Sequence, residues 1–89
     1  MVRLREGVSE AQVREFLDAI AAVPFPGRRS YTGGRDLGLV PDTMDLVMVS
    51  DFDDEQAYRD WVADPRHREV STKLLRPIAE QIVRGQFPL

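Results

Sequence analysis

The stretch MDLVMVSDF, residues 44–52, decides the fold of this chain. Its apolar side chains alternate as they do along an extended strand: Met44, Leu46 and Met48 on one face, Val47 and Val49 on the other. A strand with apolar residues on both faces is typically covered on both sides. One layer of helices covers only one face of the sheet, so we expect another structural layer to cover the other face.

Two helical regions are predicted around this strand. Ser9 and Gln12 have the spacing of a capping box, so the first helix starts there and ends before Pro24. A second helix is expected to start at Asp53, with Gln56 at its third position. Its expected buried stripe comprises Ala57, Tyr58, Trp61 and Val62.

A further helical segment follows with Asp64 as its cap and Pro65 in its first turn. It is expected to turn Val70, Leu74 and Leu75 inward and to end at Pro77.

Three more strands are expected from short apolar or alternating runs, with a turn-rich loop over Gly33–Gly38. They are Val2–Arg5, Arg28–Thr32 and Gln81–Phe87. The resulting order is β-α-β-β-α-β, which is the split arrangement of ferredoxin-like folds. We therefore predict an α+β fold with an antiparallel sheet in a single domain over residues 1–89.

Composition excludes several function classes. Twelve basic and fifteen acidic residues give a net charge of −3, and the basic residues are scattered, which argues against a nucleic-acid-binding protein. The chain has no cysteine, no apolar run long enough to span a membrane and no apolar signal-peptide core at its start. These features favour a cytoplasmic protein without disulfides.

Metal binding is not expected from the residues available. One histidine and no cysteine leave only carboxylates, and their dense cluster does not have the spacing of a calcium loop. That cluster comprises Asp51, Asp53, Asp54 and Glu55, and helix capping and solvation explain it better. No metal and no cofactor are predicted.

Several segments together resemble the stress-responsive dimeric α/β barrel (Dabb) family. They are REGVSEAQVREFL (5–17), GGRDL (33–37), MDLVMVSDF (44–52), AYRDWVADPRH (57–67) and LLRPIAEQI (74–82). The resemblance implies a homodimer in which the sheets of two copies pack face to face as a dimeric α+β barrel. Family members have a longer first strand, so the first strand of this chain is expected to be truncated.

The resemblance also extends to polyketide cyclases of the olivetolic acid cyclase type, which close a ring in a linear poly-β-ketone without a cofactor. It implies that His67, the only histidine, is the general base. The tyrosine that assists this base in a plant cyclase is replaced here by Trp61, which has only an indole N–H to donate. Asp64 replaces another histidine of the motif, and a carboxylate close to the imidazole would favour its charged form.

Other residues are weaker candidates for the same small-molecule site. Tyr31 and Tyr58 carry phenols that could replace that of the missing tyrosine, although both also suit a core. Leu46 and Met48 are expected to line the pocket or to pack in the core. The alternative function is a non-catalytic dimer, either a stress-associated ligand-binding protein or a structural module, in which His67 only packs at a helix start.

Overall fold

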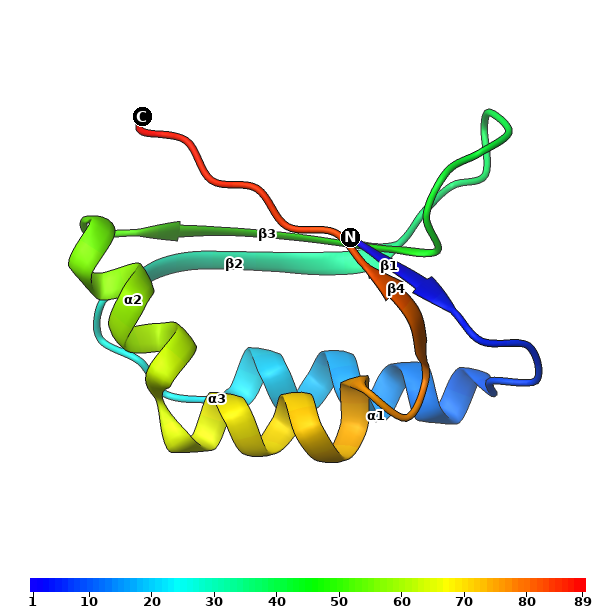
Figure 1. Cartoon of the computed structure of the whole chain (residues 1–89), viewed down its shortest axis with the longest axis horizontal. Helices are drawn as coiled ribbons and strands as arrows, with labels where there is room; N and C mark the ends of the chain where they lie inside the picture. Colours follow the sequence, from blue (N-terminus) through cyan, green and yellow to red (C-terminus); the bar gives the residue numbers. More distant parts are fainter.

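All helices lie on one side of a four-stranded antiparallel sheet (Figure 1). The computed structural model describes all 89 residues. Its elements are β1 (Val2–Leu4), α1 (Glu10–Ala22), β2 (Arg28–Arg35), β3 (Leu46–Phe52), α2 (Glu55–Ala63), α3 (Pro65–Val70), a π-helical turn (Ser71–Leu75) and β4 (Ala79–Ile82). The strand order β2-β3-β1-β4 confirms the predicted ferredoxin-like arrangement.

The starts of the helices follow from local hydrogen bonding. The capping box of α1 is confirmed, because the Gln12 amide donates to Ser9 Oγ over 3.2 Å and the Ser9 amide donates to Gln12 Oε1 over 2.9 Å. The prediction that Asp53 caps α2 is wrong by one residue. Asp54 accepts from the Ala57 amide over 2.8 Å, whereas Asp53 is held at the end of the strand pair by Gly27 and Arg29.

All four strands have bounds that differ from prediction, because strand length depends on the neighbouring strand. β1 ends at Leu4 instead of Arg5, and β3 starts at Leu46 instead of Met44. β2 continues through Gly33 and Gly34 to Arg35, since β3 offers backbone partners along that whole length. The expected loop over Gly33–Gly38 therefore starts later. The predicted last strand over Gln81–Phe87 is also wrong. β4 pairs only with the short β1 and ends at Ile82. Just beyond it, the Val83 amide donates to the carbonyl of Met1, the residue before β1.

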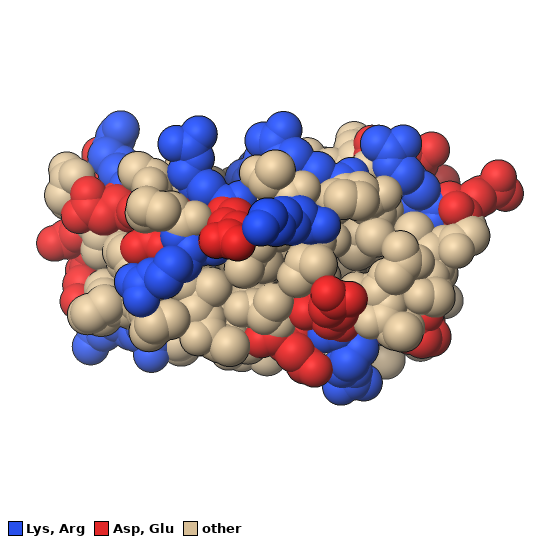
Figure 2. Space-filling view, turned by 90° about the horizontal axis from the view of Figure 1, so that it is seen from below, with Lys and Arg blue, Asp and Glu red and all other residues tan.

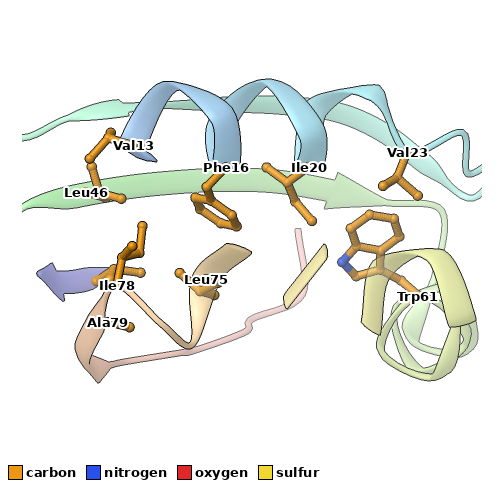
Figure 3. Close-up of a cluster of buried hydrophobic side chains, with 10 residues drawn as sticks. Val13, Phe16, Ile20, Val23, Leu46, Trp61, Leu75, Ile78 and Ala79 are labelled. Carbon is orange, nitrogen blue, oxygen red and sulfur yellow. The ribbon is translucent and has the colours of Figure 1, made fainter. Parts of the chain in front are cut away.

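The hydrophobic core fills the space between the sheet and the helices (Figure 3). Val2, Phe16 and Leu46 have at most 1% of their surface exposed and form its centre. Trp61 closes the end near Val23. The rest of the core comprises Val13, Ile20, Leu75, Ile78 and Ala79. α2 contributes a narrower stripe than predicted, because Val62 is 46% exposed.

The second face of the sheet has no cover within one chain. Because neighbours along a strand point to opposite faces, Val47 and Val49 point away from the helices that cover Leu46 and Met48. Val49 is 60% exposed. β1 is three residues long, and its register with β3 contains a single pair, Val2 with Leu46.

The helix-covered side of the molecule is a solvated surface. Figure 2 shows lysine and arginine side chains interspersed with acidic ones over this face. Exposed ion pairs one helical turn apart, Arg59 with Glu55 and Lys73 with Glu69, contribute to this pattern. The helix side is therefore charged throughout, whereas the uncovered sheet side has the apolar side chains of Val47 and Val49 at its centre.

Candidate functional site

His67 stands in the first turn of α3, where its backbone is fixed by a cap. Pro65 begins this helix, and Asp64 Oδ1 accepts hydrogen bonds from the amides of Arg66 over 2.8 Å and of His67 over 3.2 Å. The Asp64 carboxylate therefore engages the backbone of His67. The predicted cap is confirmed, and it sets the direction in which the imidazole leaves the helix.

The imidazole of His67 packs flat against Trp61. The two ring centroids lie 4.3 Å apart and the ring planes are inclined by 24°. Nδ1 of His67 is buried without a hydrogen-bond partner. Nε2 makes no hydrogen bond within the chain either, but it is not sealed from solvent. The ring therefore has one enclosed and one accessible nitrogen, and neither is occupied.

Burial lowers the pKa of His67 below its ordinary value of 6.5, because the charged ring loses hydration. The nearby carbonyls of Trp61 and Val62 act in the opposite direction, although neither makes a well-formed hydrogen bond with Nδ1. The positive charge of Arg84 lowers the pKa further, and the Asp64 carboxylate opposes it weakly. The imidazole is therefore neutral at pH 7, the form that accepts a proton.

A row of stacked groups extends from the half-buried ring of His67 past the buried indole of Trp61. After Trp61 comes the guanidinium of Arg28, whose Cζ lies 4.5 Å from the Trp61 ring centroid and 4.9 Å from that of Tyr31. We call His67, Trp61, Arg28 and Tyr31 the stacked row. Its four members come from α3, α2 and β2, so only the tertiary fold brings them together.

Arg28 also closes the end of α1. Its guanidinium donates to the carbonyls of Ile20, Ala21 and Val23, each over 3.2 Å, where the helix has no basic residue of its own in its last turn. No carboxylate pairs with Arg28. The stacked row therefore contains a positive charge that is balanced only by helix carbonyls.

Tyr31 carries the second unpartnered polar atom. Its Oη is buried and makes no hydrogen bond, and burial raises the pKa of its phenol. The ring lies across Gly33, where a Cβ atom would stand 2.5 Å from Oη and 3.1 Å from Cγ of Met48. Gly33 is thus required for the close approach of this ring to the strand. A buried hydroxyl without a partner is uncommon in a folded protein.

The remaining predicted site residues lie outside the stacked row. Tyr58 packs edge-on against Phe52 with ring centroids 5.4 Å apart, and its hydroxyl accepts from Gln86 Nε2 over 3.0 Å. Leu46 is fully enclosed by the core, and Met48 packs against the core beside Gly33. Arg28 and Arg84 were not among the predicted site residues. Neither residue belongs to a motif, and their roles depend on segments distant in the sequence.

Two surface grooves of the molecule contain none of the predicted site residues. One lies between α1 and α3, with Ala19, Ala22, Val70 and Leu74 along it and Arg66 and Lys73 at its sides. The other runs beside β4. No group of three or more histidine or acidic side chains is arranged to hold a metal ion. None of the helices combines the length and the apolar character that crossing a bilayer requires.

The strand order, the helix layer and the bare sheet face define a ferredoxin-like α+β protein. The family model of the stress responsive A/B barrel domain matches residues 1–87. The chain therefore belongs to the Dabb family.

Two solved structures resemble the chain. A dimeric ferredoxin-like protein of unknown function from Thermobifida fusca is 30% identical, with a TM-score of 0.89 over 100% of this chain and 85% of that one. The Arabidopsis thaliana protein At3g17210 is 18% identical, with a TM-score of 0.76 over 99% of this chain and 93% of that one, and shows the fold alone. No curated protein sequence matches the chain.

Proposed function

We propose that this protein is a homodimer that binds a small molecule at the stacked row, and that His67 acts there as a general base in a cofactor-free, aldol-type ring closure. The observation that carries the proposal is the imidazole of His67, which is stacked on Trp61 and makes no hydrogen bond at either nitrogen, while burial lowers its pKa. The contact with Trp61 fixes the ring, while its nitrogens remain without hydrogen-bond partners from the chain.

The homodimer is supported by the uncovered sheet face. Val47 and Val49 give this face an apolar centre, and a domain of 89 residues gains stability from burying it. A symmetric dimer buries the same patch on both copies. The similar protein from Thermobifida fusca, at 30% identity, is described as dimeric.

The chemistry follows from what a neutral imidazole does beside a poly-β-ketone. The imidazole takes a proton from a carbon between two carbonyl groups and leaves an enolate. The enolate carbon then bonds to a second carbonyl carbon of the same chain, and the imidazolium returns its proton to the resulting alkoxide. The guanidinium of Arg28 is the donor of the stacked row for a developing oxyanion.

A non-catalytic ligand-binding dimer is the second candidate. Trp61 stands where the related cyclases have a tyrosine, and its flat contact with the imidazole supplies packing without a hydroxyl. Tyr58, the other phenol near this end of the fold, is already bonded to Gln86. In this case the stacked row holds a carbonyl compound through hydrogen bonds and does not transform it.

One variant separates these two functions. We expect His67→Ala to abolish cyclisation of a linear poly-β-ketone, followed by chromatography of the products, while binding of the same compound persists in calorimetry. Arg68→Ala, on an exposed neighbour in α3, is the matched control and should cyclise normally. Turnover that survives His67→Ala excludes this base, and binding without turnover in the unmodified protein favours the non-catalytic function.

The dimer is tested separately by sedimentation. Val49→Lys places a charge on the uncovered sheet face and should convert the dimer to a monomer. Val62→Lys introduces the same charge at an exposed valine on α2 and should leave the dimer intact. A dimer that tolerates Val49→Lys as well as it tolerates Val62→Lys would contradict packing through this face.

A further inference from the structure

Two segments of the chain extend beyond the sheet on its uncovered side. The arm, residues 36–45, connects β2 to β3, and the tail, residues 83–89, follows β4. Figure 1 shows both on the side of the sheet opposite the helices, with the arm rising at one end of the molecule and the tail ending at the other.

The arm and the tail carry most of the exposed apolar surface. Six of the nine large apolar side chains that are exposed lie in these two segments. They are Leu37 and Leu39 (each 82%), Val40 (61%), Val83 (40%), Phe87 (80%) and Leu89 (94%). Contiguous exposed apolar groups mark surfaces that bind another protein.

The arm has a defined shape. Asp36 Oδ2 accepts from the Gly38 amide over 2.8 Å, which closes a turn at its base. Gly38 and Asp42 both have positive φ angles, of 69° and 65°, and so make two further bends. These turns present the apolar side chains between them away from their own protomer.

We infer that each arm packs against the tail of the partner copy, so that two arm–tail contacts clasp the dimer at its ends. This inference rests on the homodimer proposed above and adds which segments meet in it. Two-fold symmetry allows two arrangements. In the first, the arm of each copy contacts the tail of the other copy. In the second, the two arms contact each other and the two tails contact each other.

The charges decide between these two arrangements. The arm contains three aspartates, Asp36, Asp42 and Asp45, and no basic residue, whereas the only charged side chain of the tail is Arg84. Asp36, Asp42 and Arg84 form no ion pair within the protomer. An arm–arm contact would bring two acidic segments together, while an arm–tail contact brings opposite charges together.

The absence of cysteine makes a direct test possible. In the double variant Leu39→Cys/Phe87→Cys, oxidation should give a covalent dimer on a non-reducing gel. The single variants Leu39→Cys and Phe87→Cys are the controls, and each should stay at least about tenfold less cross-linked, because like segments do not meet.

Each other outcome has a defined meaning. Cross-linking of Leu39→Cys alone demonstrates an arm–arm contact and overturns the inference. A sedimenting dimer that no cysteine combination cross-links also overturns it, while the homodimer itself stands. If the unsubstituted protein sediments as a monomer, the proposed homodimer is wrong, and the arm–tail contact is wrong with it.

Charge reversal gives a second readout that needs no cross-link. Asp42→Arg alone and Arg84→Asp alone should each weaken the dimer about two- to fivefold in its dissociation constant, and the combination should restore it. Losses that simply add in the double variant would contradict contact between arm and tail.

Discussion

The imidazole of His67 lies 4.3 Å from the indole of Trp61, with the two rings inclined by only 24°. The six-residue separation places Trp61 near the end of α2 and His67 in the first turn of α3, with the break at Asp64 between them. This break folds the two helices so that the rings meet face to face. The stack encloses Nδ1 and leaves Nε2 as the accessible nitrogen.

Acidification should destabilise the protein through His67. Because the folded-state pKa lies below the ordinary value of 6.5, the unfolded chain binds a proton first as the pH falls. The free energy of unfolding therefore decreases as the pH drops through 6.5 towards the folded-state pKa, and this contribution is constant above that window. His67→Gln should remove it, as urea unfolding between pH 5 and 7.5 measures. An imidazole pKa above 6.5 by NMR would contradict this.

Removal of the positive charge of Arg84 should raise the pKa of His67. Arg84 lowers this pKa by repelling the imidazolium, so Arg84→Gln relieves the repulsion while keeping a polar side chain. An NMR titration of the imidazole measures the change. Arg68→Gln is the control, since Arg68 has no resolved influence on His67, and equal shifts in both variants would point to net charge alone.

Tyr31→Phe should stabilise the ligand-free protein by about 1 kcal/mol, because it removes a buried hydroxyl that has no partner. Thermal unfolding measures the effect. Tyr58→Phe, which loses an exposed bond to Gln86, should change stability by less than about 0.5 kcal/mol. A destabilised Tyr31→Phe would mean that this hydroxyl already has a partner.

Asp64→Ala should cost about 1 kcal/mol of stability, because two amides in the first turn of α3 lose their acceptor. Asp64→Ser should restore most of the loss, since serine caps a helix through its hydroxyl. The imidazole resonances of His67 should shift in the alanine variant and return in the serine variant. Unchanged resonances in Asp64→Ala would show that the cap does not position the ring.

Much of the fold was predictable because its signals are local. The capping box at Ser9, the cap at Asp64 with Pro65 after it, and the doubly apolar strand each depend on residues close in sequence. The boundaries that were wrong depend on distant partners. β2 extends to Arg35 because β3 pairs with it there, and β4 stops at Ile82 because β1 is short.

The site was predictable only where it lies within one motif. His67 and Trp61 belong to a single segment, and the family resemblance singled out both. Arg28 joins them from β2, more than thirty positions earlier, and Tyr31 follows it. No periodicity or spacing connects these positions, because the contact of a cation with a ring depends on tertiary packing and not on their separation in the sequence.

The sequence by itself determined the order of the elements, the bare apolar face of the central strand and the single histidine at a capped helix start. These properties follow from side-chain alternation, capping residues and proline positions, all of which act within a few residues. Only the tertiary structure decided that His67, Trp61, Arg28 and Tyr31 form one row, and that Tyr31 Oη and His67 Nδ1 are buried without partners. The reason is that burial and hydrogen bonding depend on every segment packed around an atom, and those segments come from the whole chain.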